Sequence, residues 1–345
     1  MIRIKELLAY DTYKATRSTG RTLFFALMFI PLIALLVEGI LRFVSIPAWL
    51  MIPTIDRELN YSEIDIKLSR LFELEQEEKV NCFILGSSMS DFGIDPHILN
   101  QKPVISGIGE PLCFNLALKA MKPELTAHIA SFLVQNSNPS ILILGISPLD
   151  FTGGQDMIRK FVHSPWLRYQ DGQYSLEGWM VENLYTYRYW LSFLKYRDPA
   201  YRTDLKNQLV GIDSFGSQTI EDTGRTYTVL PEMEFADFDL KENDLVGLER
   251  ISSLNSPEMK IIAVEMPIHP DYLSRYTCGG ETGYEEHLIQ PIQRILDAEE
   301  IPFIRSQKQI RDIVPTEGWK DYLHLNHSGK DKFSHWLAGE LTDLP

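Results

Sequence analysis

One continuous apolar stretch near the N-terminus constrains this chain more than any other feature of its sequence. Residues 22–44 read TLFFALMFIPLIALLVEGILRFV. A helix rises about 1.5 Å per residue, so a stretch of this length covers a hydrocarbon core of roughly 30 Å. Glu38 and Arg42 lie one helical turn apart near its far end, where the two charges can meet each other and the membrane interface. The stretch predicts a transmembrane anchor over residues 22–46.

The charges that precede the anchor predict its orientation. Residues 1–21 carry five basic and two acidic side chains, and an excess of Lys and Arg favours the cytoplasmic side of a membrane. We therefore expect residues 1–21 in the cytoplasm and the main domain outside it, on the periplasmic or outer face of the cell membrane. Two alternatives are a cleaved signal peptide, for which no good small-x-small cleavage site follows the stretch, and a helix buried in the protein core.

The chain as a whole is acidic, with 33 Lys and Arg against 47 Asp and Glu among 345 residues. Nucleic-acid binding needs clustered Lys and Arg, so this balance argues against a nucleic-acid partner. The three cysteines are too few and too widely spaced for a disulfide scaffold or a CxxC metal site. Cys82 and Cys113 lie in apolar runs, which favours buried thiols.

The segment between the anchor and the main domain is rich in charge. Within residues 47–79, Ile64, Leu68, Leu71 and Leu74 recur at helical spacing among acidic and basic residues. This pattern predicts an amphipathic connector.

Residues 80–345 predict an α/β domain built on a parallel sheet. Uniformly apolar runs that end in small or polar residues indicate buried strands, and intervening runs with a helical period indicate helices. Apolar strands that alternate with helices are typical of a parallel sheet covered on both faces. Residues from about 151 to 250 break the alternation and predict an aromatic-rich insertion. The expected strands are 80–86, 103–107, 140–147, 259–266 and 302–306, and the expected helices are 123–136 and 285–300.

Two short polar segments carry the predicted chemistry. Gly86-Ser87-Ser88 follows a buried strand, where a glycine permits a tight turn and a serine hydroxyl can be exposed beside backbone N–H groups. Asp321 precedes His324 by three residues, just ahead of an expected helix. A serine needs a base to take its proton, and that base needs a partner that fixes its tautomer. The two segments together predict a Ser-His-Asp site.

These segments resemble those of the SGNH (GDSL-like) hydrolases and acyltransferases. The likeness covers residues 80 to about 340 and rests on LGSSMSDFGIDP (85–96) and DYLHLNHSGKDKFSHWLA (321–338). Gly-Ser-Ser in place of Gly-Asp-Ser makes the chain most similar to the membrane-anchored, envelope-facing branch, which includes the teichoic-acid D-alanylation protein and the alginate O-acetylation proteins. The resemblance implies a three-layer α/β/α sandwich.

The resemblance also implies a role for individual residues. Ser88 would be the nucleophile and its backbone N–H an oxyanion donor, His324 the general base, and Asp321 its orienting carboxylate. The family usually adds oxyanion donors from a glycine in its second block and an asparagine in its third. This chain departs from both, and Asn115 or Ser147 could compensate as donors.

Other polar residues have simpler alternatives. His269 follows the fourth expected strand and could either face the site or form a hydrogen-bonded turn. Asp321, His324 and His327 offer three zinc ligands, but His327 lies across an expected helix cap and no fourth ligand is evident. We therefore expect no metal and no cofactor. Asp150 is expected to form a turn.

Two functions from different classes fit these residues. The first is a serine acyltransferase or esterase that acts on acyl groups of an envelope glycan or other surface polymer, through an acyl-serine intermediate. The resemblance to the anchored branch suggests transfer, with a multi-pass membrane partner that supplies the acyl donor. The second is a non-catalytic envelope assembly or polysaccharide-binding protein that keeps the fold without part of the oxyanion machinery.

Overall fold

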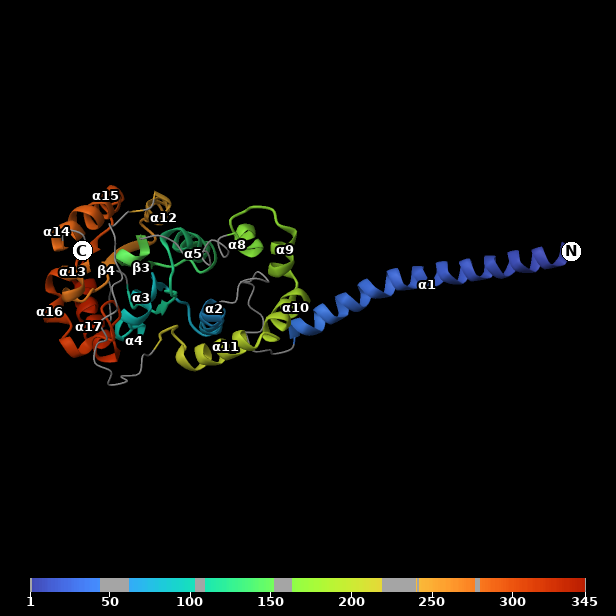
Figure 1. Cartoon of the computed structure of the whole chain (residues 1–345), viewed down its shortest axis with the longest axis horizontal. Helices are drawn as coiled ribbons and strands as arrows, with labels where there is room; N and C mark the ends of the chain where they lie inside the picture. Colours follow the sequence, from blue (N-terminus) through green and yellow to red (C-terminus); the bar gives the residue numbers. More distant parts are fainter. Residues whose placement is uncertain are drawn as a thin grey trace.

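The computed structural model describes residues 2–43, 62–102, 109–151, 163–218, 240, 242–276 and 280–344. One long helix, α1 (Ile2–Phe43), extends away from a body that holds the other described residues (Figure 1). Its segment Thr22–Phe43 has a mean hydropathy of 2.5 and is almost entirely unburied. Within the described part of the chain it is the one helix long and apolar enough to cross a membrane. The expected apolar helix is present, and it is not buried in the protein core.

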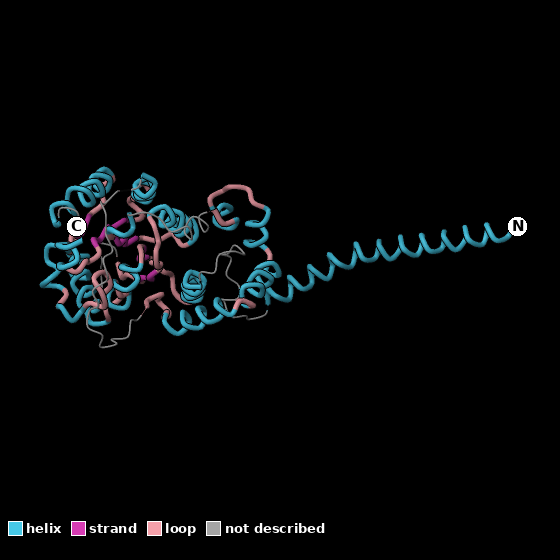
Figure 2. Tube along the Cα trace, in the orientation of Figure 1, coloured by secondary structure: helices cyan, strands magenta, loops and turns pink. Residues whose placement is uncertain are grey.

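Five short strands form one parallel sheet in the middle of the body (Figure 2). Nearly all strand residues are buried, as uniformly apolar strands require when both faces of a sheet are covered. Four of the five strands coincide with expected runs, which confirms a parallel sheet in a mixed α/β body. The strands lie in the order β2-β1-β3-β4-β5 and are β1 (Cys82–Leu85), β2 (Cys113–Asn115), β3 (Ile141–Ile146), β4 (Lys260–Glu265) and β5 (Phe303–Ile304).

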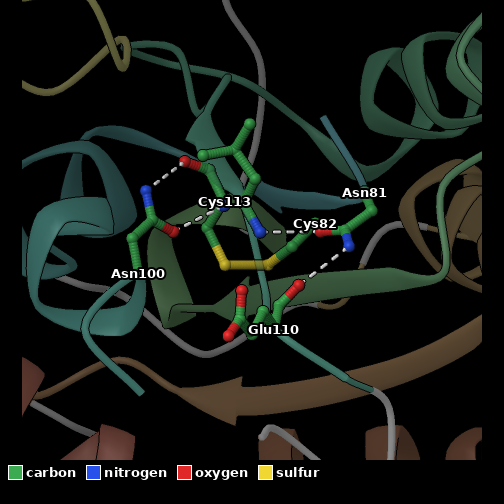
Figure 3. Close-up of a disulfide and its surroundings, with 6 residues drawn as sticks. Asn81, Cys82, Asn100, Glu110 and Cys113 are labelled. Atoms are coloured by element: carbon green, nitrogen blue, oxygen red, sulfur yellow. Dashed lines mark hydrogen bonds between the residues drawn. A yellow bond between two sulfur atoms is a disulfide. The ribbon is translucent and has the colours of Figure 1, made fainter. Parts of the chain in front are cut away.

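The edge strand β2 does not fall on the second expected run. Residues 103–107 lie outside the described residues, and the chain that pairs with β1 is Cys113–Asn115. The side chain of Asn100 holds the first residue of this strand by two hydrogen bonds. Its Oδ1 accepts from the Cys113 N–H at 2.6 Å, and its Nδ2 donates to the Cys113 carbonyl at 3.2 Å (Figure 3). A three-residue strand held by a side chain has too short a pattern to be found from the sequence.

Cys82 and Cys113 form a disulfide, so the prediction of buried thiols is wrong (Figure 3). The two residues are direct partners in the parallel register of β1 and β2, and both are fully buried. The sequence separation of 31 hides this pairing, because only strand register brings the two sulfur atoms together. A disulfide is typical of proteins in oxidising compartments outside the cytosol.

Helices surround the sheet. The two expected helices are confirmed as α5 (Pro123–Asn136) and as the consecutive η2 (Glu285–Ile289) and α15 (Gln290–Ala298). The other helices of the sheet region are α3 (Ser88–Gly93), α4 (Pro96–Leu99), α6 (Pro148–Phe151), α12 (Glu242–Ser252), α13 (Pro270–Tyr276), α14 (Gly280–Tyr284), η3 (Gln307–Gln309), α16 (Ile310–Ile313), η4 (Thr316–Gly318) and α17 (His327–Asp343).

The expected connector contains a helix that belongs to the body. In α2 (Ser62–Glu75), Ile64, Leu68 and Leu71 are buried in the main core, as their spacing predicts. The structure differs from the prediction in burying charged residues of the same helix as well, among them Lys67. Charge in the sequence suggested a solvated face, but these charges have partners from distant parts of the chain. Residues 47–61 lie outside the described residues.

Most of the described part of the insertion is helical, while residues 212–218 form a turn closed by a bridge between Ile212 and Gln218. Its helices are α8 (Pro165–Gln170), α9 (Leu176–Asn183), α10 (Tyr185–Tyr196) and α11 (Pro199–Gly211). Trp166 and Tyr201 are buried, whereas Trp190 and Phe193 are exposed. Figure 1 shows α9 and α10 at the end of the body that meets α1.

Candidate active site

The turn after β1 presents Ser88 at the carboxyl edge of the sheet. Gly86 has a φ of +141°, a conformation that L side chains rarely adopt, and a Cβ there would lie 2.9 Å from the Gly145 carbonyl oxygen. The chain therefore turns sharply into α3, which Ser88 opens. Ser87 and Met89 are buried on either side, while Ser88 is partly exposed.

The strand order independently indicates that the turn after β1 lies at a functional position. In a sheet ordered β2-β1-β3-β4-β5, the chain leaves β1 and β3 toward opposite edges, and the carboxyl ends of two such strands are where ligands generally bind in open parallel sheets. Ser88 follows β1 directly, and Gly145 and Ser147 lie at the end of β3. The fold alone thus directs attention to the same turn as the Gly-Ser-Ser motif.

The segment that carries His324 is a short closed loop. Trp319 and Leu325 form an antiparallel bridge across its base. Asn326 caps α17 by accepting from the Gly329 N–H at 3.0 Å, and its own N–H donates to the Gly318 carbonyl at 3.0 Å. The loop is therefore fixed to the start of α17, as the expected helix cap implies.

Helix α17 carries this loop to Ser88. Its Ser334 hydroxyl accepts from the Asp95 N–H at 2.8 Å and lies 3.4 Å from the Gly93 carbonyl, at the end of α3. The α17 side chains Phe333 and Leu337 are fully buried in the core that also contains β1. Packing of the last helix against the first helix after β1 is what joins two segments more than 200 residues apart in the sequence.

Ser88, His324 and Asp321 form a continuous hydrogen-bonded chain. The Ser88 Oγ lies 2.9 Å from His324 Nε2, and His324 Nδ1 lies 2.9 Å from Asp321 Oδ2 and 3.0 Å from Oδ1. With its proton on Nδ1, the imidazole donates to the carboxylate and leaves Nε2 to accept the serine proton. The arrangement can therefore activate a serine hydroxyl.

The carboxylate of Asp321 is held ionised. Burial alone would raise its pKa, but the hydrogen bond and charge of His324, together with the N–H groups of Leu323 and His324, outweigh burial and lower the pKa. The two N–H groups lie 2.9 and 2.8 Å from Oδ1. Asp321 therefore orients the ring. The ring of Phe92 also meets His324 edge-on, with centroids 5.6 Å apart.

Asn115 and Ser147, the expected oxyanion donors, both contact other groups within the protein. The Asn115 amide is fully buried and donates to the carbonyls of Ile94 at 3.0 Å and Ser90 at 3.4 Å, while its oxygen accepts from the Ala117 N–H at 3.0 Å. Ser147 is also fully buried, and its hydroxyl lies 3.5 Å from that of Ser87. In this arrangement both side chains brace the turns that surround the site.

His269 adopts the simpler of its two alternatives. Its Nδ1 accepts from the Asp271 N–H at 3.1 Å, and its ring lies edge-on to Trp319 and Tyr322 at centroid distances of 5.2 and 5.6 Å. Burial lowers the pKa of this imidazole. The His269 N–H also donates to the Tyr322 carbonyl at 3.0 Å. His269 therefore supports the loop of Asp321 and His324 from the end of β4.

The turn after β3 contains a second carboxylate. Asp150 Oδ2 accepts from the Ser147 N–H at 3.0 Å, which is the turn that the sequence predicts. Burial raises the pKa of Asp150 to about 6, although hydrogen bonds from Ser87 and Ser147 oppose this shift. Asp150 is 5% exposed, so it has little access to a ligand outside the protein.

A buried ion pair that sequence reasoning missed lies beneath the serine. Lys67 of α2 and Asp91 of α3 are fully buried, with Nζ 2.5 Å from Oδ1, and Lys67 also donates to the Ala117 carbonyl at 2.6 Å. Asp91 lies one helical turn after Ser88. The sequence feature that could have indicated this pair is Lys67 itself, which lies on the apolar face of the expected helix, directly before Leu68. The pair fixes α3 to α2.

The described residues contain no group of three His, Cys, Asp or Glu side chains that could hold a metal ion. His327 is exposed at the first turn of α17, and both ring nitrogens of His324 face Ser88 and Asp321. The chain matches no known protein family in a scan of families, and no curated protein matches it.

Proposed function

We propose that this chain is a membrane-anchored serine acyltransferase or esterase of the SGNH type, with a three-layer α/β/α body on the extracytoplasmic side. The observation that carries the proposal is the distance of 2.9 Å from Ser88 Oγ to His324 Nε2, with Asp321 behind the ring. Few arrangements other than nucleophilic catalysis call for a partly exposed serine, histidine and carboxylate in one hydrogen-bonded chain.

In the proposed reaction, Ser88 Oγ attacks the carbonyl carbon of an ester, and its proton passes to His324 Nε2. The leaving alcohol takes that proton, which gives an acyl-serine. A hydroxyl of the acceptor, or water, then attacks the acyl carbon while His324 accepts its proton and returns it to Ser88. The N–H of Ser88, in the first turn of α3, can donate to the oxyanion because it has no intrahelical acceptor.

Two features support an extracytoplasmic location. The apolar segment of α1 is long enough to cross a membrane, and the excess of positive charge precedes it. The Cys82–Cys113 disulfide fits an oxidising compartment. The substrate class we favour is therefore an acylated envelope glycan or surface polymer. A single helix cannot carry a polar acyl donor across a bilayer, so a donor made in the cytoplasm would need a multi-pass membrane partner.

Labelling of the full chain with a serine-directed fluorophosphonate tests this proposal. Attack by Ser88 Oγ on phosphorus expels fluoride and leaves a stable phosphonyl-serine. We expect wild type to be labelled, Ser88→Ala to be unlabelled, and His324→Ala to react at least about 1,000-fold more slowly. Ser131→Ala and His335→Ala, which change residues of the same types on α5 and α17, are matched controls and should label normally. Labelling that persists in Ser88→Ala would contradict the proposal.

A second function, a non-catalytic envelope assembly or polysaccharide-binding protein, is favoured by one specific observation. Both Asn115 amide hydrogens and the Ala117 N–H donate to partners within the protein, so neither group is available as a second oxyanion donor in this arrangement. Loss of one donor costs roughly 100 to 1,000-fold in turnover. Folded wild-type protein that binds an envelope polysaccharide but resists the fluorophosphonate would support this second function.

A further inference from the structure

The anchor helix is joined to the body by two charged side chains. The Glu38 carboxylate accepts from the N–H groups of Tyr185 and Thr186 at 2.8 and 2.9 Å, and from the Thr186 hydroxyl at 2.8 Å. Arg42 donates to the Asn183 carbonyl at 2.7 Å and to Glu38 at 3.1 Å. Charges that would be costly in lipid thus bind the start of α10.

These contacts fix the depth of the start of α10 relative to the membrane. Glu38 and Arg42 lie in the last six residues of the apolar segment Thr22–Phe43. The residues they bind must lie at the same level, which is the membrane interface when α1 spans the bilayer. Figure 1 agrees, because α9 and α10 form the end of the body that meets α1.

Helix α10 exposes an aromatic stripe, which we define as Trp190, Phe193 and Tyr196. The three residues are spaced three apart, and they are 51%, 56% and 40% exposed. The rings of Trp190 and Phe193 stack with centroids 6.2 Å apart. The guanidinium of Arg202, from α11, lies 5.8 Å from the centre of the Tyr196 ring. The stripe therefore starts with a stacked pair of rings and ends beside a cation.

The composition of α10 fits a lipid surface. Its sequence YTYRYWLSFLKY contains two basic residues and no acidic one, in a chain with a net charge of −14. Aromatic rings with polar edges favour the headgroup region, and the exposed Arg202 beside Tyr196 favours anionic lipids. Lys195 does not contribute, because it is buried and lies 3.6 Å from Asp65. A helix with these properties, whose first residues are held at the level of the membrane interface, is well suited to contact lipid.

We propose that the aromatic stripe of α10 lies in the headgroup region of the same membrane that α1 crosses. The body then has two attachments, the anchor helix and the stripe, and cannot rotate freely on a tether. Its orientation to the membrane is fixed, and with it the height at which Ser88 meets a substrate. This proposal does not depend on the chemistry of Ser88.

Depth-dependent fluorescence quenching tests the stripe. The full chain carries Cys278→Ser and one new labelled cysteine, and it is reconstituted in vesicles of phosphatidylethanolamine and phosphatidylglycerol. The test position is Phe193→Cys, the matched control is Val246→Cys on α12, which is 46% exposed, and Leu32→Cys reports the anchor. We expect a nitroxide near the lipid headgroup to quench the Phe193 label several-fold more than the Val246 label, and aqueous iodide to do the reverse. The Leu32 label should be quenched only by nitroxides deep in the acyl chains.

A Phe193 label that iodide quenches as strongly as it quenches the Val246 label, while Leu32 reports the bilayer, would overturn the proposal. Such a result would leave the stripe as a surface for water or for another protein. A Leu32 label outside the bilayer would overturn it too, because the depth argument begins with the anchor. Neither result depends on Ser88, whose reaction with the fluorophosphonate tests the proposed function separately.

A second variant changes the stripe itself. Trp190→Glu with Tyr196→Glu should reduce lipid quenching of the Phe193 label, since it places two acidic residues at the stripe. Unchanged quenching would also count against the proposal.

Discussion

Two neighbouring strands of this sheet end alike, but their serines differ in surroundings. β1 is followed by Gly86, Ser87 and Ser88, while β3 includes Gly145 and is followed by Ser147. Ser88 is partly exposed and meets His324, whereas Ser147 is fully buried among polar groups of its own turn and of the turn after β1. The difference shows that a serine after a strand becomes a candidate nucleophile only where a histidine from another segment lies within hydrogen-bonding distance of it.

The largest effect on reaction rate is expected when His324 loses the carboxylate of Asp321. Asp321→Asn should fold normally but lower the rate of reaction with fluorophosphonate or p-nitrophenyl acetate by about 10⁴-fold, because an amide favours the wrong imidazole tautomer. Asp331→Asn is the matched control, since Asp331 lies 3.6 Å from the exposed His335 on α17, where no serine is involved. Near-normal activity of Asp321→Asn would show that the pair of His324 and Asp321 does not activate Ser88, and that Ser88 does not differ from Ser147 in this respect.

Substitutions beneath the turn after β1 should also lower the free energy of unfolding more than substitutions in the turn after β3. Lys67→Met leaves the carboxylate of Asp91 buried without its cation, which should destabilise the folded state by about 3–5 kcal/mol. Urea unfolding of the full chain in detergent measures this. The double variant Lys67→Met with Asp91→Leu should recover most of the loss, because two apolar side chains replace the pair. If the single and double variants were equally stable, the ion pair would not support α3.

The turn after β3 should respond to pH instead. The pKa of Asp150 is about 6 in the folded protein and 3.8 ordinarily, so as pH rises the unfolded chain loses this proton first. The stability contributed by the protonated carboxyl is complete below about pH 4 and is lost as pH rises through 6, by about 3 kcal/mol. Asp150→Asn should lack this loss in urea unfolding at a series of pH values. An unchanged pH profile would mean that Asp150 titrates normally.

The smallest effect is expected for the serine after β3. Ser147→Ala removes one hydroxyl from a buried polar group and should cost about 1 kcal/mol of stability, with labelling by the fluorophosphonate within a few-fold of wild type. The comparison with Ser88→Ala is direct, because the two residues occupy equivalent positions on adjacent strands. Loss of labelling in Ser147→Ala would restore Ser147 as an oxyanion donor.

Much of the fold could be predicted, because buried parallel strands have a strong local signal. The runs at 80–86, 140–147 and 259–266 are mostly apolar, and each contains a strand. The segment at 123–136 has a helical period and a proline at its start, and α5 has those bounds. The strand at Cys113–Asn115 was missed because three residues hold no usable period.

The candidate site was predicted only in part. Ser88, His324 and Asp321 could be paired because each lies at the boundary of a strand or helix, and the structure brings the three together. Asn115 and Ser147 could not be judged, because a local sequence does not say whether an amide or hydroxyl faces a cleft or a backbone carbonyl. Their catalytic roles, like those of the three residues of the hydrogen-bonded chain, stay predictions.

By itself, the sequence determined the apolar N-terminal helix, the positions of four strands and the three residues of the hydrogen-bonded chain, because periodicity and turn residues act over short distances. Only the tertiary structure decided that Cys82 meets Cys113, that Lys67 meets Asp91, and that Glu38 meets the start of α10. Each of those contacts joins segments far apart in the chain. Burial of a charge or a sulfur depends on what the rest of the fold places beside it, and no local pattern contains that information.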